Sequence, residues 1–292
     1  YLDKFPELKK HIPYNCIMRR NVGILFAYEK DADYIITIDD DNFFVSGDFI
    51  SSHEVGINKE ITIIASDTGW YNVCKHLEEE HGREFYHRGF PLEYRYLEEK
   101  VNSETKNVHV VINAGFWLGD PDIDALTRLY YSNRPINVTA YLRSENFALA
   151  VGTWSPFNSQ NTALARGVIP AYFLSPFVGR YDDIWGSYIV KRIADHFDHY
   201  ISFGKPVVKH ERNPHNYWND LAKKKLGMML SKSLILILQK TELKGKTYRE
   251  CYGEIIEHLG KELETLKLSE THRAFFAGYL KGMKVWKKTF ER

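Results

Sequence analysis

Short apolar runs, each bounded by polar residues, recur along the first two thirds of the chain and predict buried strands. The clearest are predicted over residues 33–38, 61–65, 108–112 and 200–209, with weaker ones near 147–152 and 168–173. Helical spacing alternates with them, over residues 15–30, 71–81 and 182–199 and in a segment that begins at Asp120 and Pro121. Strands that alternate with helices predict an α/β fold.

The pattern changes after Pro214. Residues 217–240, 246–267 and 270–290 carry the spacing of amphipathic helices, and their Lys and Glu residues are expected on solvated faces. We therefore predict an α/β domain over residues 1–213 and a helical C-terminal extension over residues 214–292. Because the chain opens in what reads as the middle of an α/β fold, a further strand is expected to precede Tyr1.

Composition narrows the classes of function. The formal net charge of +1 gives no overall field that would favour nucleic acid or an acidic membrane. The longest aliphatic run is too short to cross a bilayer, no signal peptide opens the chain, and three widely spaced cysteines make neither a disulfide framework nor a metal motif. These features predict a cytoplasmic protein without a membrane span, or in a eukaryote one peripheral to a secretory-pathway membrane, and leave homo- or hetero-oligomers open.

The most distinctive stretch is the strand over residues 33–38, which runs into three consecutive carboxylates, Asp39, Asp40 and Asp41. Ligands of open α/β sheets bind at the carboxyl ends of strands, and hard cations such as Mg²⁺ and Mn²⁺ prefer oxygen ligands. Adjacent like charges repel each other, and a bound cation relieves that repulsion. The cluster therefore indicates a cation site, with a solvated acidic turn as the alternative.

Three more polar clusters follow predicted strands or begin predicted helices. They are Arg88-Gly89-Phe90-Pro91 with Arg95, the segment from Asn113 through Gly115 and Trp117 to Asp124, and Gly179-Arg180-Tyr181-Asp182-Asp183-Ile184-Trp185 followed later by His210. Each has a plain alternative, because an aspartate can serve only as a helix N-cap and arginines or a histidine can be surface residues.

Together, the four clusters predict one site for a metal-bound diphosphate and a polyhydroxyl substrate. A metal and arginines can neutralise a leaving diphosphate as a glycosidic C–O bond breaks. A carboxylate can accept a proton from an attacking hydroxyl group or stabilise oxocarbenium character at the anomeric carbon. This chemistry favours a nucleotide-sugar enzyme with a GT-A-like (Rossmann-like) glycosyltransferase fold.

Four motifs, in this order, resemble the reversibly glycosylated polypeptides, a family that includes the plant UDP-arabinopyranose mutases. They are Ile38-Asp39-Asp40-Asp41, Arg88-Gly89-Phe90-Pro91-Leu92-Glu93-Tyr94-Arg95, Gly115-Phe116-Trp117-Leu118 with Pro121-Asp122-Ile123-Asp124-Ala125, and Gly179-Arg180-Tyr181-Asp182-Asp183-Ile184-Trp185. The resemblance implies an enzyme dependent on a divalent metal, Mn²⁺ or Mg²⁺, that interconverts the pyranose and furanose forms of UDP-arabinose. It also implies reversible self-glycosylation on an arginine.

The resemblance carries over to individual residues. By motif position Arg88 is the glycosylated arginine and Arg95 the second arginine of its motif. The aspartate motif implies that residues 39–41 bind metal and diphosphate, with Asp39 and Asp41 as metal ligands and His210 completing the metal shell. The remaining residues assigned to nucleotide-sugar binding are Asp40, Asn113, Gly115, Trp117, Arg180 and Trp185.

Arginine raises a chemical difficulty, because a guanidinium is always protonated and has no lone pair to attack with. If Arg88 is glycosylated, another group must take its proton, and Asp182 or Asp183 is the candidate. In the alternative, Arg88 only holds the diphosphate while the sugar's own O4 attacks C1.

Two stretches depart from the pattern expected of the family. Residues 155–162 replace an expected Cys-Gly-Met segment, and residues 210–214 differ from the plant pattern, which bears on the sugar more than on the fold. Two rival functions stay open: a glycosyltransferase that passes the sugar from a UDP-sugar to a separate acceptor, and a non-catalytic partner subunit of such enzymes.

Overall fold

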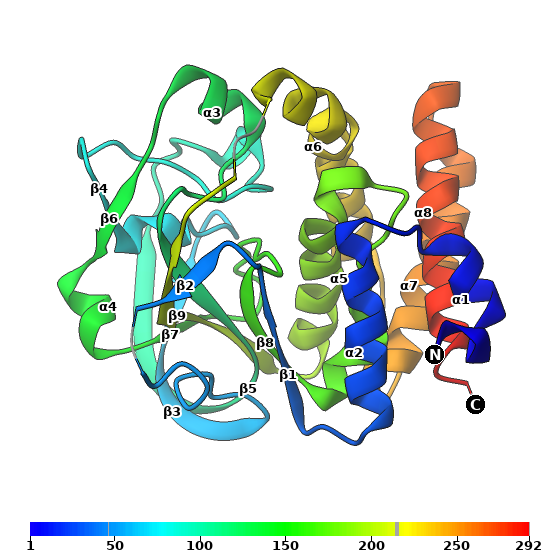
Figure 1. The fold of residues 1–292 in the computed structure, drawn as a ribbon, viewed down its shortest axis with the longest axis horizontal. Coiled ribbons are helices and arrows are strands. Elements are labelled where there is room, and N and C mark those ends of the chain that lie inside the picture. The colour runs from blue at the N-terminus through cyan, green and yellow to red at the C-terminus, as the bar shows by residue number, and fades with distance from the viewer. Residues whose placement is uncertain (46, 214–215, 292) are drawn as a thin grey trace. The chain divides into compact units, whose positions relative to one another are not determined.

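The computed structural model describes residues 1–45, 47–213 and 216–291 (Figure 1). It confirms a mixed α/β fold, with a seven-stranded mixed sheet and long C-terminal helices. The chain forms two compact units: a sheet unit of residues 34–165 and 197–222, and a helical unit of residues 1–33, 166–196 and the described residues from 223 onward. Each unit contains residues from before and from after residue 213, so a domain boundary at that residue stays a prediction. Pro214 lies outside the described residues.

Every strand of the described chain lies in the sheet unit. The strands are β1 (Tyr34–Ile38), β2 (Asn42–Phe44), β3 (Ile57–Ser66), β4 (Leu77–Glu79), β5 (Val101–Gly119), β6 (Pro135–Val138), β7 (Phe147–Leu149), β8 (Asn161–Ala165) and β9 (His199–His210). The main sheet has the order β1-β8-β5-β3-β7-β9-β2, with β3–β7 and β5–β9 parallel, and β4 pairs separately with β6. The predicted strands at 33–38, 61–65, 108–112 and 200–209 are confirmed, and β7 covers the start of the one near 147–152.

Strand β5 organises this unit because it is long enough to pair along both of its edges. Its first half is antiparallel to β3, and its second half runs parallel to β9 until Gly119 lies opposite His210. Strand β2 pairs with β9 on the other side and places Asn42 opposite His210 as well. The register therefore brings the end of β5, the end of β9 and the residue after the acidic triplet to one place.

The close approach of β5, β8 and β9 depends on a glycine. Asn161 of β8 donates hydrogen bonds from Nδ2 to the carbonyl oxygens of Phe116 (3.1 Å) and Pro206 (3.0 Å). A Cβ built on Gly115 would overlap both the Asn161 amide and the Pro206 carbonyl, one of which is backbone. Only the absence of a side chain at residue 115 leaves room for these bonds.

Replacing Gly115 with alanine is therefore expected to destabilise the fold by about 1–3 kcal/mol, the usual cost of overpacking. The matched control is Gly23→Ala in helix α2 (Arg20–Glu29), where a Cβ meets nothing within 4 Å. Thermal unfolding of both variants measures the difference. Equal melting temperatures would contradict the packing argument.

Helices make up the secondary structure of the helical unit. They are α1 (Pro6–His11), α2, α5 (Asp182–His196), the part of α6 (Tyr217–Lys240) from Lys223, α7 (Tyr248–Thr265) and α8 (Glu270–Lys288), with short 3₁₀ turns η1 (Leu2–Lys4), η2 (Ile17–Arg19), η5 (Arg166–Ala171) and η6 (Gly179–Tyr181). The three predicted C-terminal helices are confirmed (Figure 1). No described helix is long and apolar enough to cross a membrane.

Three predicted elements are wrong. Residues 71–81 form a 3₁₀ turn, η3 (Val73–His76), and strand β4, because pairing with β6 overrides the helical spacing. The strand expected near 168–173 is not formed there. Strand β8 ends at residue 165, and the 3₁₀ turn η5, with Pro170 inside it, follows. Pro170 lacks the N–H that a sheet ladder needs.

The helix predicted from Asp120 begins later. Asp124 is the N-cap of α3 (Ala125–Tyr130), since its Oδ1 accepts from the backbone N–H groups of Leu126 and Thr127, both at 2.9 Å. The sheet unit also holds α4 (Ala140–Ser144) and the 3₁₀ turn η4 (Leu92–Tyr94). Because the helix begins at residue 125, Asp120 and Asp122 lie in a loop, where their side chains form ion pairs with arginines.

Candidate functional site

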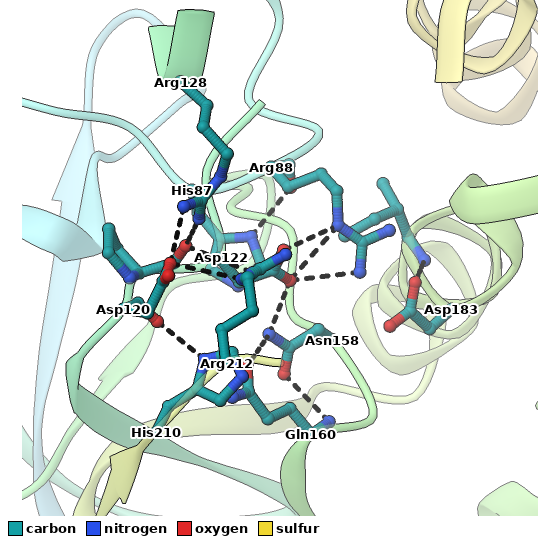
Figure 2. A network of polar contacts seen from close by, with 12 residues as sticks. His87, Arg88, Asp120, Asp122, Arg128, Asn158, Gln160, Asp183, His210 and Arg212 are labelled. Carbon is teal, nitrogen blue, oxygen red and sulfur yellow. Dashed lines mark hydrogen bonds and ion pairs between the residues drawn. The ribbon is translucent and has the colours of Figure 1, made fainter. Parts of the chain in front are cut away.

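The candidate site lies at the ends of β5 and β9 in the sheet unit. In Figure 2, the labelled residues of the sheet unit come from the Arg88 loop, the loop after β5, helix α3, the 158–160 segment, and the end of β9 with Arg212 just after it. The strand ends are tied together by backbone bonds from Asp120 N–H to His210 O (3.1 Å) and from Glu211 N–H to Asp41 O (3.0 Å). The position of the site follows from the sheet register.

His210 faces the acidic triplet through one ring nitrogen. Its Nδ1 lies 2.6 Å from the Asp120 carbonyl, and because a carbonyl can only accept, Nδ1 carries a proton. Nε2 lies 3.2 Å from Asp41 Oδ2, and the other oxygen of that carboxylate, Oδ1, is buried without a hydrogen-bond partner. In the neutral tautomer Nε2 is an acceptor beside an anion, so a proton or a cation is needed between them.

This pair fits a divalent cation. A metal-binding histidine usually donates its other ring N–H to a backbone carbonyl, as His210 does to Asp120. Neighbouring ligands of an octahedral ion at about 2.1 Å lie about 3 Å apart, which matches the His210–Asp41 separation. The described residues contain no group of three or more His, Cys, Asp or Glu side chains that could hold an ion. Further ligands would come from water and substrate phosphate, as is usual for Mg²⁺.

The rest of the acidic triplet is less enclosed. Asp39 is half-buried; its backbone N–H donates to Gln160 O (3.0 Å), and its carbonyl accepts from Asn42 N–H (3.3 Å). Asp40 is exposed. Of the three predicted metal ligands, the structure thus brings Asp41 and His210 together. A metal contact of Asp39 and a diphosphate contact of Asp40 stay predictions.

Arg88 is almost fully buried and is held by Asp122. Its Nε donates to Asp122 Oδ1 (2.9 Å) and its Nη2 to Oδ2 (3.0 Å), a bidentate arrangement. The Arg88 backbone N–H also donates to the Asp122 carbonyl at 2.8 Å. Gly89 follows with a φ of +90°, a left-handed conformation that favours glycine and turns the loop. The predicted key arginine is therefore fixed in backbone and side chain.

A chain of amides joins this pair to the acidic triplet. Asn158 Nδ2 donates to Asp122 Oδ2 (2.7 Å) and lies 3.3 Å from Gln160 Oε1. Gln160 Nε2 in turn donates to Asn42 Oδ1 (3.0 Å), directly after the three aspartates. All of these side chains are buried or half-buried. The segment over residues 155–162 thus contacts both ends of the site.

Asp120, the first aspartate of the loop after β5, forms ion pairs with two other arginines. Arg128 Nη1 lies 2.6 Å and Arg212 Nε 3.2 Å from Asp120 Oδ1. Before it, Gly119 has a φ of +86°, and a Cβ there would lie 2.6 Å from His210 O. Because Asp120 supplies the carbonyl for His210 and Asp122 the carboxylate for Arg88, one loop contacts both parts of the site.

Arg95 belongs to a separate ion pair. Its Nη2 lies 2.8 Å from Asp124 Oδ2 and 3.1 Å from Phe90 O, so it ties the Arg88 loop to the start of α3. Burial alone would raise the pKa of Asp124, but the Arg95 charge and hydrogen bonds from Thr127 outweigh it and hold that pKa below its ordinary value. These contacts describe a residue that supports the loop; its predicted catalytic role stays a prediction.

A cavity of about 450 Å³ opens beside His210. Its lining includes Gly119, Asp120, Arg128, Asn133, Lys209, Arg212 and Tyr217. The Asn133 side chain is buried, and neither its Oδ1 nor its Nδ2 has a hydrogen-bond partner. Cationic side chains and an aromatic ring next to the His210–Asp41 pair suit a phosphorylated ligand.

Three residues predicted to bind the nucleotide sugar lie within strand β5. Asn113 is fully buried; its Oδ1 accepts from His53 Nδ1 (2.8 Å) and its Nδ2 donates to Ser202 Oγ (3.0 Å). Burial lowers the pKa of His53 to about 4, so this histidine is neutral at physiological pH. Trp117 is buried, and Gly115 admits the Asn161 amide. A direct contact with a nucleotide stays a prediction for all three.

The other predicted residues belong to the helical unit. Asp182 and Asp183 are both buried in the first turn of α5, where the helix dipole favours carboxylates, and Asp183 Oδ1 accepts from Ile184 N–H at 2.9 Å. Neither is an N-cap, because η6 immediately precedes the helix. Trp185 is a core residue that donates from Nε1 to Ser231 Oγ (3.0 Å). Arg180, in η6, is half-buried.

Sequence reasoning gave several residues of this network no site role of their own, although some of them lie in predicted clusters or segments. They are Asp120, Asp122, Arg128, Asn158, Gln160 and Arg212. One signal was present: aspartates at residues 120, 122 and 124 directly follow a buried strand. Their partners could not be read from it, because those partners come from other loops.

Comparison with known proteins supports the resemblance. The model of the family described as "Reversibly glycosylated polypeptide" matches residues 6–292. The chain is 28% identical over 258 residues to "UDP-arabinopyranose mutase 2" of Arabidopsis thaliana, an alignment that covers 85% of this chain and 66% of that protein. It is 29% identical over 261 residues to "Probable UDP-arabinopyranose mutase 1" of Zea mays, over 82% of this chain and 65% of that protein.

The chain thus spans about two thirds of the length of these relatives, 66% and 65% respectively. The family match covers nearly the whole chain and includes all four motifs and the loop that joins Arg88 to His210. The protein belongs to the reversibly glycosylated polypeptide family.

Proposed function

We propose that the protein is a metal-dependent nucleotide-sugar mutase on a GT-A-like fold, which interconverts the pyranose and furanose forms of a UDP-sugar of the UDP-arabinose type. One observation carries this proposal: a single loop holds both a histidine–carboxylate pair that fits a cation and a buried arginine in bidentate contact with a carboxylate. The names of the relatives point to the same reaction.

The diphosphate end of the substrate is expected at His210 and Asp41. A divalent ion there would supply positive charge to the diphosphate as the C1–O bond breaks. The cavity beside His210 adds Arg128, Lys209 and Arg212, which are paired with Asp120 or Glu211 and would hold the leaving UDP with the donor groups that these ion pairs leave over. Retention of UDP matters because a mutase must return the sugar to the same leaving group.

The sugar end is expected at Arg88. In the proposed cycle Arg88 takes the sugar at C1 and is glycosylated reversibly, while O4 replaces O5 in the ring before UDP returns. A bidentate carboxylate fixes the guanidinium plane, and this orientation reduces the entropy cost of attack at C1. Residues 155–162, which include Asn158, are the candidates for sugar choice.

The test is incubation with UDP-arabinofuranose and Mn²⁺ without any acceptor, with the ring form followed by NMR. We expect UDP-arabinopyranose to accumulate until the two forms reach equilibrium. Slow release of UDP without interconversion would instead favour a glycosyltransferase that needs a separate acceptor. A protein that binds UDP-arabinose and does neither would fit a non-catalytic partner subunit.

A further inference from the structure

Glycosylation of Arg88 requires a proton acceptor close to the guanidinium. A nitrogen that bonds to C1 while it keeps both of its hydrogens becomes a strong acid and must lose one of them. Complete transfer before attack is unfavourable, since the ordinary pKa values of guanidinium and carboxylate groups differ by roughly nine units. The transfer therefore has to accompany attack, across a hydrogen bond that already exists.

The structure describes such a hydrogen bond. Arg88 Nη2 donates to Asp122 Oδ2 at 3.0 Å, and each of the two residues as a whole is more than nine-tenths buried. Asn158 Nδ2 donates to the same oxygen at 2.7 Å and keeps the carboxylate in the guanidinium plane. The π lobes of Nη2 stand perpendicular to that plane, so C1 can approach from one face without displacing Asp122.

We propose that Asp122 is a catalytic residue that accepts the Nη2 proton of Arg88 as this nitrogen attacks the sugar. The inference rests on the proposed function and replaces Asp182 and Asp183 as the candidates for this step. It follows from direct contact: Asp122 meets the reacting guanidinium at two nitrogens within one unit of the fold.

The step balances in atoms and charge. The bond from Nη2 to C1 forms, the bond from C1 to the diphosphate oxygen breaks, and one Nη2 proton moves to Asp122 Oδ2. The products are a glycosylated guanidinium, which is still cationic, neutral Asp122 and UDP that is retained in the site. When UDP attacks C1 again, the nitrogen leaves with its electron pair and recovers the proton from Asp122.

The experiment compares the rate at which Arg88 acquires a pentose. The full chain is mixed with UDP-arabinopyranose and Mn²⁺, quenched at intervals, digested and analysed by peptide mass spectrometry. Asp122→Asn keeps the shape of the side chain but removes the basic oxygen, and we expect labelling to slow by about 100-fold or more. UDP affinity, measured by calorimetry, is expected to stay within about threefold, which separates this loss from unfolding.

Two further variants sharpen the result. Asp31→Asn makes the same chemical change at an exposed carboxylate paired with Arg166 and controls for the loss of one charge. Asp122→Ala leaves space beside Arg88, and added sodium formate is expected to restore part of the labelling rate. A rate that follows the basicity of the added carboxylate indicates proton transfer, since a purely structural role requires only the charge and shape of that carboxylate.

The outcomes distinguish the two levels of the proposal. Labelling of wild type but equal labelling of Asp122→Asn overturns the role of Asp122 and leaves the mutase intact. Loss of labelling in Asp182→Asn or Asp183→Asn, with normal labelling in Asp122→Asn, would return the step to α5. A wild-type protein that interconverts the sugar rings without any label on Arg88 overturns the covalent step, and Asp122 with it.

Discussion

Arg88→Lys is expected to slow the interconversion of the two ring forms by about 10³-fold while the protein stays folded. Lysine keeps the positive charge but offers one nitrogen on a flexible stem, so it cannot reproduce the two parallel bonds to Asp122. It also lacks the planar group that the proposed cycle glycosylates. The rate is measured by NMR with UDP-arabinofuranose and Mn²⁺, and the label on residue 88 by mass spectrometry.

Stability distinguishes chemistry from packing in this variant. Removing one partner of a buried ion pair typically costs about 3–5 kcal/mol, and lysine should cost less because it keeps the charge. The comparison variant is Arg95→Lys, which keeps a charge beside Asp124 but loses part of the contact with Asp124 and Phe90 O. If Arg95 only supports the loop, this change should affect the melting temperature more than the rate. A rate for Arg88→Lys close to that of wild type would rule out Arg88 as the sugar-bearing residue.

Asp41→Asn is expected to cause a loss of about 100-fold in affinity for UDP in the presence of Mn²⁺. The amide is neutral, so it removes the negative charge that faces His210 Nε2 at 3.2 Å and weakens any bound cation. Wild-type protein treated with EDTA should show the same weak affinity. EDTA should change Asp41→Asn little, since the metal-dependent part is already lost.

Titration calorimetry with UDP, with and without Mn²⁺, provides the measurement. Glu211→Gln is the matched control: it also removes one negative charge next to His210, but from an exposed side chain paired with Lys209. We expect this variant to keep the response to Mn²⁺. An affinity that does not depend on the metal in wild type would overturn the assignment of Asp41 and His210 as a cation site.

The sequence by itself determined the local features. A β-branched run that ends in acidic residues must leave those residues at a strand end, and strand β1 confirms this at Ile38. The long C-terminal helices were also predictable, because their apolar spacing is local and the caps of α7 and α8, Thr247 and Ser269, directly precede each helix. Such features depend on residues a few positions apart, which a single sequence displays directly.

Some elements whose conformation depends on distant partners were mispredicted. Leu77 and Glu79 lie in a strand only because β6 supplies the pairing some sixty residues later in the chain. The helix start was misplaced for a related reason. Asp120, Asp122 and Asp124 have the same side chain at equal spacing, and each is chemically able to cap a helix.

The tertiary structure alone decided what these three carboxylates do. Asp120 contacts Arg128 and Arg212, Asp122 contacts Arg88, and Asp124 contacts Arg95 and caps α3. Strand register decides this, because pairing of β5 with β9 places the loop after Gly119 against His210 and the Arg88 loop. The sequence thus supplied the charged groups and the family, whereas long-range pairing, which no local pattern encodes, selected the partner of each charge.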